Sequence, residues 1–315
     1  MHQRRHPSWC ARRPIPYFSG TRSILGFCLA LYGILVCSSV AFCRTRNASA
    51  SVRGSMQAVS GGTLQLKTPV SHSLVGAQRV SYVLPLNSGS FVRLACTSVN
   101  LDIVVKVVSP EGTNVVELDT TDGAGGSRLV FWIANTPGKY LVEVRSAHDT
   151  ASQGSYELEA EEIRPAGVED NTVIEAQASY LEAEKLRRAG EGNSLQTSVS
   201  KYQQSATFWE TAEQPAQEAE VLKQKAYVLY LLGQNDDALQ AATRALALSR
   251  SAHNIAEEAA ALHTLGQVYD ALGDKQKERE FYNQALLLQL SDDFVPQRAD
   301  TLNDLGVAYN DLGDA

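Results

Sequence analysis

The side chains that could act as nucleophiles or transfer protons are too scattered to form a recognisable catalytic site. Cys96 is the only cysteine after residue 43, and it lies in the apolar run 91–96, which favours a buried thiol over a reactive one. The histidines after residue 50 are His72, His148, His253 and His263, at spacings that match no zinc-protease motif. A phosphate-binding glycine loop and a Gly-x-Ser-x-Gly elbow are also missing from the sequence. We therefore expect a non-enzymatic chain without cofactor or metal ion.

The acidic side chains are numerous but unsuited to a catalytic pair. Asp236 and Asp237, like Glu257 and Glu258, are neighbours in sequence and point in different directions on a helix. The formal net charge is −7, made up of +8 in residues 1–53, −3 in residues 54–168 and −12 in residues 169–315. An acidic C-terminal half repels phosphate, so nucleic acid is not an expected partner.

Residues 24–43 are uncharged, and five arginines precede them, as in a secretory signal peptide or a signal anchor. Ser39 and Ala41 suit cleavage before Phe42, whereas the length of the run is close to that of a membrane-spanning helix. Both alternatives stay open, with residues 1–43 as the signal peptide or anchor. Because more arginines precede the run than follow it, the rest of the chain is expected outside the cytoplasm, either secreted or periplasmic, or attached to the membrane through residues 24–43.

Residues 44–71 have the Ser, Gly, Ala and Thr content of a flexible linker, with Gly61-Gly62 as its most flexible point. In residues 72–164 the hydrophobic period changes to two, for example where Tyr156, Leu158 and Ala160 alternate with glutamates. Short alternating runs separated by Gly, Pro and Asn turns predict an antiparallel, jelly-roll-like β-sandwich.

Four short motifs in this region occur in a familiar order: DIVV at 102–105, SPEG at 109–112, PGKYLVEV at 137–144 and GSYEL at 154–158. This order resembles the bacterial pre-peptidase C-terminal-like domain, which implies an accessory, non-catalytic module of an exported protein. Some members of that family bind calcium through loop carboxylates. Asp119 and Asp122 stand beside a glycine-rich turn here, but two such acids are more often part of an ordinary turn, and Ser109 replaces an aspartate common in the family.

Residues 170–315 repeat with a period of 40 residues. Gly233, Gly273 and Gly313 are each 40 apart, and residues 262–269 (LHTLGQVY) recur as 302–309 (LNDLGVAY). Self-similarity at such a period is typical of stacked helical hairpins. Gly266 and Gly306 would let a paired helix approach closely, while Gly273 would end a helix in left-handed geometry.

These residues resemble the tetratricopeptide repeat (TPR), which implies an all-α superhelix with a groove lined by the first helix of each hairpin. The 40-residue period is longer than the roughly 34 residues usual in that family. Repeats of this longer type are similar to bacterial arrays that precede caspase-like CHAT peptidase domains, often behind a similar sandwich. The resemblance therefore implies a protein-interaction scaffold that binds a peptide or partner protein. The alternative is the regulatory N-terminal part of a CHAT-type cysteine peptidase whose catalytic domain is missing from this chain.

Groove positions of the family, carried over to the better repeats, give a set of candidate partner-binding residues. The alternative for each is an ordinary solvent-facing side chain. The candidates are Lys223, Tyr227, Tyr230, His263, Gln267, Asp270, Asn303 and Asn310.

The last repeat is expected to be truncated, because only two residues follow Gly313, whereas a second helix follows Gly273. Leu302, Leu305 and Tyr309 would then lack the helix that normally covers them. We therefore expect a longer gene product, and self-association of this chain through the open repeat.

Overall fold

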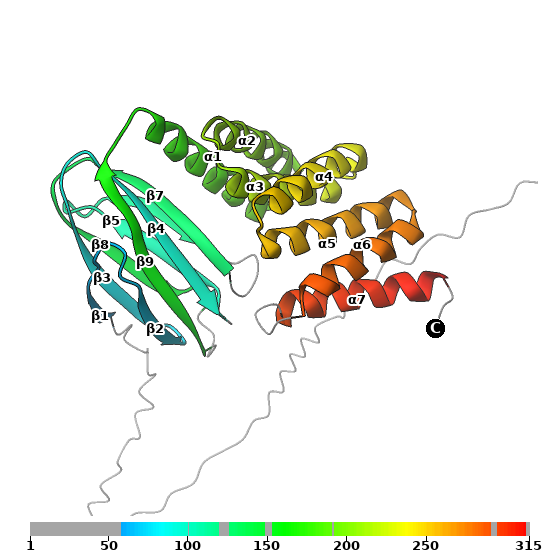
Figure 1. The fold of residues 1–315 in the computed structure, drawn as a ribbon, viewed down its shortest axis with the longest axis horizontal. Coiled ribbons are helices and arrows are strands. Elements are labelled where there is room, and N and C mark those ends of the chain that lie inside the picture. The colour runs from blue at the N-terminus through cyan, green and yellow to red at the C-terminus, as the bar shows by residue number, and fades with distance from the viewer. Residues whose placement is uncertain are drawn as a thin grey trace, which may run out of the picture. The chain divides into compact units, whose positions relative to one another are not determined.

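A computed structural model describes residues 58–99, 101–119, 126–148, 153–190, 192–290 and 295–312. In these ranges a β-rich part comes first and a helical part follows (Figure 1). The predicted signal or anchor, residues 24–43, lies outside the described residues. Within the ranges above, none of the helices combines the length and the apolar character needed to cross a membrane.

The β-rich part consists of two sheets packed face to face, which confirms the predicted sandwich. One sheet has the strand order β1-β3-β8-β5-β6 and the other has the order β2-β9-β4-β7. The strands are β1 (Ala58–Thr63), β2 (Val70–Val75), β3 (Arg79–Leu86), β4 (Ser90–Val99), β5 (Ile103–Val108), β6 (Asn114–Asp119), β7 (Gly126–Ala134), β8 (Gly138–Ser146) and β9 (Gln153–Pro165).

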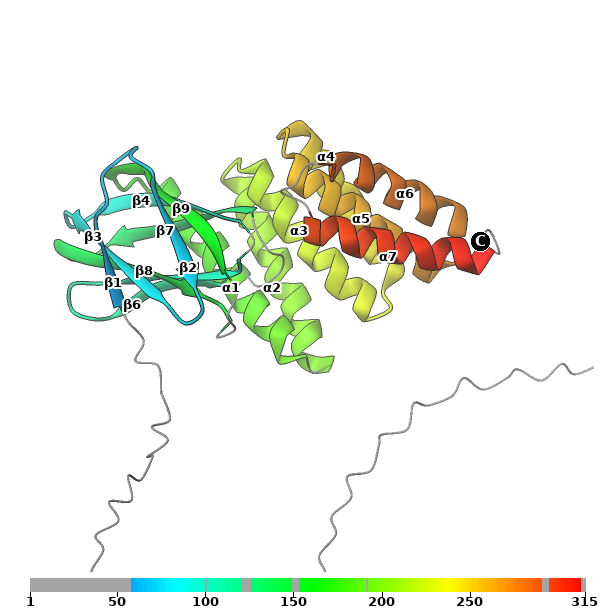
Figure 2. The same ribbon diagram turned by 90° about the horizontal axis from the view of Figure 1, so that it is seen from below.

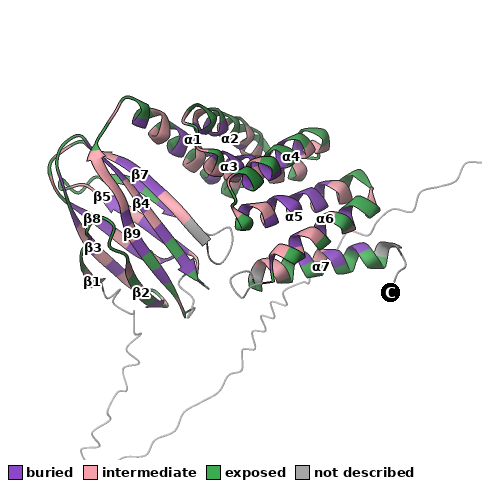
Figure 3. Cartoon of the chain, in the orientation of Figure 1, coloured by how far each residue is buried: buried purple, intermediate pink, exposed green. Residues whose placement is uncertain are grey.

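The sandwich core follows the period-two pattern of the sequence. Tyr156, Leu158 and Ala160 of β9 are buried, and the residues between them are more exposed. Val142 of β8 is also buried, whereas its neighbour Leu141 faces outward. Figure 3 shows this alternation of buried and exposed residues along the strands. Because successive side chains of a strand point to opposite faces, one row from each sheet forms a common hydrophobic core.

Two details of the sandwich differ from the sequence-based expectations. The pairing is not wholly antiparallel, because β1 runs parallel to β3. The linker prediction is also wrong for residues 58–71, which contain β1 and the start of β2. Gly61 is packed and not a flexible point, since a Cβ atom there would lie 2.2 Å from the Tyr82 ring. The absence of a side chain thus lets β1 lie against Tyr82.

The helical part consists of successive antiparallel hairpins, α1 with α2, α3 with α4 and α5 with α6, followed by α7 (Figure 2). The first hairpin begins at Glu169. The helices are α1 (Glu169–Ala189), α2 (Gly192–Thr211), α3 (Pro215–Leu231), α4 (Asn235–Ser251), α5 (Ile255–Leu272), α6 (Lys275–Leu288) and α7 (Val295–Leu312).

The α5–α6 hairpin bears out the predicted roles of its glycines. Gly273 ends α5 with a φ of 78°, and the side chain of Asp274 then accepts a hydrogen bond from the Lys277 N–H at 3.1 Å. A Cβ atom at Gly266 would lie 2.4 Å from the Tyr282 ring, so the two helices approach closely there. Gly306 of α7 does not have this role in the structure, because no heavy atom lies within 4 Å of its Cβ position among the described residues.

The sandwich and the first hairpin share an interface built from both polar and aromatic contacts. The outward-facing Phe91 and Phe131 belong to the same hydrophobic cluster as the helices, and the Phe131 ring centroid lies 5.6 Å from that of Trp209. The guanidinium of Arg164 in β9 donates to the buried carboxylate of Asp170 in α1 at 2.7 Å. The hydrogen bonds from Arg164 are the main cause of the lowered pKa of Asp170.

At the edge of the second sheet, one residue of β7 is hydrogen-bonded by a side chain of α1. The side chain of Gln177 in α1 accepts a hydrogen bond from the Phe131 N–H and donates one to the Phe131 carbonyl, both at 2.8 Å. Its amide therefore replaces a neighbouring strand at the edge of β7. This contact holds β7, and with it Arg128, beside the helices.

Candidate functional site

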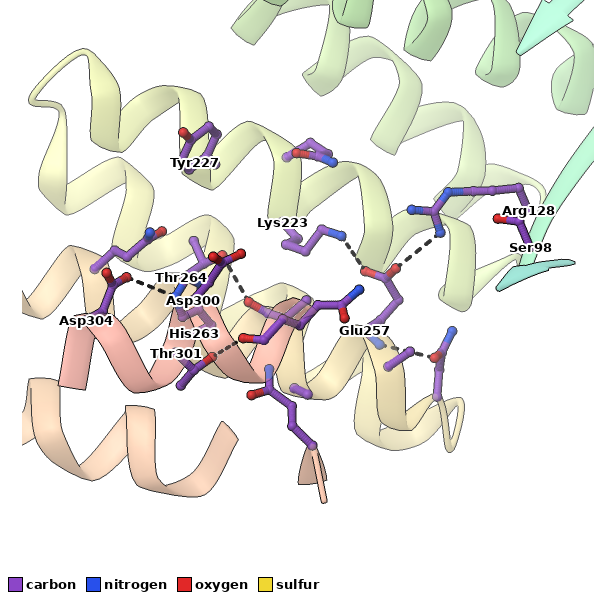
Figure 4. Close-up of a pocket in the computed structure, with 18 of the residues that line it drawn as sticks. Ser98, Arg128, Lys223, Tyr227, Glu257, His263, Thr264, Asp300, Thr301 and Asp304 are labelled. Carbon is purple, nitrogen blue, oxygen red and sulfur yellow. Dashed lines mark hydrogen bonds and ion pairs between the residues drawn. The ribbon is translucent and has the colours of Figure 1, made fainter. Parts of the chain in front are cut away.

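A cavity of about 770 Å³ lies along the first helices of successive hairpins. Lys223 and Tyr227 of α3, His263 of α5 and Asp304 of α7 line it, and Ser98 at the end of β4 lines it from the sandwich. Figure 4 shows these side chains converging from three helices and one strand. The cavity is therefore a groove of the repeats to which the sandwich also contributes.

Glu257, in the first turn of α5, is the centre of the charged contacts in this cavity. Its carboxylate lies 2.9 Å from the Lys223 ammonium of α3 and 3.8 Å from the Arg128 guanidinium of β7. Arg128 also lies 3.3 Å from Glu220 of α3. The group thus connects two hairpins to the sandwich (Figure 4).

The environment keeps Glu257 charged although it is only 7% exposed. Burial alone would raise the pKa of Glu257, because a carboxylate loses its hydration. The two cations, Lys223 and Arg128, outweigh this effect and lower the pKa of Glu257 below its ordinary value. A charged carboxylate at this position therefore holds both cations in place.

The other side of the groove carries a second polar pair. The Nε2 atom of His263 in α5 and the Oδ2 atom of Asp304 in α7 lie 3.1 Å apart. The hydrogen bond to His263 is the main cause of the lowered pKa of Asp304. Groove-lining residues of successive first helices are thus in direct contact.

The eight candidate residues occupy three equivalent positions of the 40-residue repeat, and the structure brings five of them to the cavity. One repeat position is occupied by Lys223, His263 and Asn303. The position four residues later is occupied by Tyr227 and Gln267. The third position, that of Tyr230, Asp270 and Asn310, does not line this cavity. Tyr230 instead stands beside Tyr227, with ring centroids 6.4 Å apart, and the Asp270 carboxylate contacts the Lys275 ammonium.

Several groove residues were missed from the sequence. Glu257 was considered only as a neighbour of Glu258, because the sequence gives no sign that Lys223 and Arg128 surround it. Arg128 belongs to a different domain, so no repeat position points to it. Asp304 could have been found, since it lies at the 40-residue equivalent of Thr264, beside a predicted groove position.

The remaining candidates for chemistry lie apart from this groove. Cys96 is buried in the sandwich core, and burial raises the pKa of its thiol to about 12, so the thiol is uncharged and unreactive as expected. Asp119 pairs with Arg188 of α1 at 2.8 Å, while Asp122 lies outside the described residues. Within the described ranges, no three His, Cys, Asp or Glu side chains gather closely enough to hold a metal ion.

Residues 217–291 match the family model of the tetratricopeptide repeat. The matched segment covers the α3–α4 and α5–α6 hairpins, which supply most of the groove. No protein of curated function matches the chain.

Several solved structures are similar to parts of this chain. BtubC from P. vanneervenii is 18% identical over 44% of this chain and 57% of its own, with a TM-score of 0.41. The TPR2AB domain of yeast Sti1, in a complex with pHSP90, is 19% identical over 44% of this chain and 50% of its own, with a TM-score of 0.34. A pre-peptidase C-terminal domain of collagenase from Bacillus anthracis is 18% identical over 34% of this chain and 95% of its own, with a TM-score of 0.24.

Proposed function

We propose that this chain is a protein-interaction scaffold whose repeat groove binds an extended peptide segment of a partner protein. The supporting observation is the cavity of about 770 Å³ along α3, α5 and α7, the first helices of successive hairpins, which line it with polar and aromatic side chains. A surface built from repeated helices presents regularly spaced contacts, which suits an extended chain better than a compact small molecule. The tetratricopeptide match over residues 217–291 agrees with this proposal.

The fixed polar contacts of the groove also support a binding role. Lys223 and His263 each have a charged partner within the protein, at 2.9 Å and 3.1 Å. Side chains already held by such contacts lose little further conformational freedom when a ligand arrives. Tyr227 and Gln267, each four residues further along the same helix, line the same cavity and supply contact area and hydrogen-bonding groups.

Selection of short random peptides displayed on phage, with the full chain as bait, tests this function. Selected peptides should bind the wild type and lose binding to the double variant Tyr227→Ala, Gln267→Ala. The matched control is Gln240→Ala, Glu280→Ala, which changes exposed residues of the second helices α4 and α6. Peptides that bind the groove variant and the wild type equally, or a selection that yields no peptide, would contradict the proposal.

We also propose that this binding takes place outside the cytoplasm. The support is the arginine-preceded, uncharged run 24–43 of the sequence. A reporter enzyme fused after Arg53 should be active only when the reporter is one that requires export. Activity restricted to a reporter that works in the cytoplasm would overturn the proposal.

A further inference from the structure

Cations and acids are unevenly distributed along the groove. On the sandwich side, Lys223 and Arg128 are both held by Glu257. Arg187, the third cation that lines the cavity, lies 2.8 Å from Glu184. The three cations are therefore engaged within the protein and attract an anionic ligand only weakly.

The opposite side of the groove is acidic. Gln297, Asp300, Thr301 and Asp304 are spaced at i, i+3, i+4 and i+7, so they share one face of α7, and all four line the cavity. Asp300 is exposed to solvent, and Asp304, which contacts His263, adds a second carboxylate. The nearby Arg298 guanidinium is engaged by the backbone carbonyls of Gln289 and Leu290. In Figure 4 these acids stand on the side of the cavity away from Arg128 and Ser98.

Two residues in this part of the cavity have buried amide oxygens without a donor. The Oε1 atoms of Gln289, at the end of α6, and of Gln297 are shielded from solvent and find no hydrogen-bond partner among the described residues. Gln289 is only 2% exposed and lines the same cavity. A buried acceptor without a donor lowers stability, so a ligand that supplies N–H groups here would be favoured.

We propose that this end of the groove, formed by Gln289, Gln297 and Asp300, binds a cationic side chain of the partner peptide, preferably that of arginine. A guanidinium presents several N–H donors in a planar fork and carries no acceptor. It can therefore donate to both amide oxygens while its charge is balanced by Asp300. This inference rests on the proposed peptide-binding function and adds the charge of the residue recognised.

Other ligand classes fit these side chains less well. A carboxylate would be repelled by Asp300 and Asp304 and would offer no donor to the two amide oxygens. A metal ion prefers several carboxylate or imidazole ligands, and the described residues contain no group of three such side chains. An arginine satisfies both the acids and the unpaired acceptors.

The peptides selected on the full chain provide the first test. Those that lose binding to the Tyr227→Ala, Gln267→Ala variant should be enriched in arginine and lysine relative to the unselected library. Groove-binding peptides without this enrichment would overturn the inference and leave the proposed function intact. Failure to obtain any groove-binding peptide would overturn both.

The second test compares one selected peptide with its citrulline analogue, which keeps the shape of arginine but not its charge. The dissociation constant, measured by titration calorimetry, should rise roughly tenfold for the citrulline peptide on the wild type. In the Asp300→Asn and Gln289→Met variants this ratio should fall towards one, and Glu280→Gln on α6 should leave it unchanged. Asp300 is exposed, so its exchange keeps the test valid if Gln289→Met fails to fold. Equal affinities of the two peptides for the wild type would overturn the inference.

Discussion

Helices α5 and α7 carry the same repeat in two different environments. Leu262 of α5 is 1% exposed, whereas Leu302, which is 40 residues later, is 52% exposed. Gly266 contacts Tyr282 of α6, whereas the described residues place nothing against Gly306. A repeat motif therefore specifies what a helix can pack against. The neighbouring helix determines whether each position is buried.

The polar positions of the two helices differ in the same way. Glu257 of α5 holds Lys223 and Arg128, and its equivalent in α7 is Gln297, whose amide oxygen has no partner among the described residues. One position is therefore used for internal structure, and the other leaves an acceptor for a ligand.

The largest expected effect is the difference in free energy of unfolding between alanine variants of the two equivalent leucines. Leu262→Ala should lower the free energy of unfolding by about 2–5 kcal/mol, because it leaves a cavity in the hydrophobic core of the helical part. Leu302→Ala, at an exposed site, should change it by less than about 1 kcal/mol. Denaturant titrations of both variants measure the difference. Similar losses at the two sites would mean that the face of α7 is covered in solution.

The sequence predicted a β-rich region followed by helical repeats, and the α5–α6 hairpin among them, because the signals for these features are local. The period-two strands, the 40-residue repeat and the turn at Gly273 each follow from neighbouring residues. Strand β1 was missed because Gly61-Gly62 looks like linker, and only the Tyr82 ring explains its place. The charged centre of the groove was missed because Arg128 and Glu257 are 129 residues apart and meet only in the folded chain. The self-association expected from α7 stays a prediction.

An intermediate effect is expected at the two equivalent glycines. Gly266→Ala should destabilise the protein by about 1–3 kcal/mol, since the new methyl group would overlap the Tyr282 ring. Gly306→Ala should instead stabilise α7 by roughly 0.5–1 kcal/mol, because alanine favours a helix and the site is open. Thermal unfolding of both variants tests this opposition in sign. A loss of stability at both glycines would contradict the account of α7.

The smallest expected difference in stability is that between the wild type and a Glu257 variant. It is also the one that depends most on pH. Glu257→Gln makes the position resemble Gln297 of α7, removes the acid that Lys223 contacts and leaves Arg128 with Glu220, which should cost about 1–3 kcal/mol at neutral pH. The pKa of Glu257 is lowered in the fold, so its stabilisation is present above the ordinary glutamate pKa of about 4.3 and is lost as the pH falls through the lower folded value. The gap between wild type and variant should therefore shrink in acid.

Chemical denaturation at a series of pH values measures that gap. The control is Glu280→Gln, which removes an exposed carboxylate of α6 and should have little effect at any pH. A gap that stays constant from neutral to strongly acidic pH would show that Glu257 does not act through its charge.

The proposed peptide lies along the first helices of the hairpins. Amide hydrogen exchange of the full chain tests this placement most directly. On addition of a selected peptide, exchange should slow in the segments of α3, α5 and α7 that line the cavity. Helices α4 and α6 should change less, because the cavity lining includes no residue of either helix, only Gln289 directly after the end of α6. Protection confined to α4, to the outer sheet of the sandwich, or to no segment at all would contradict the account.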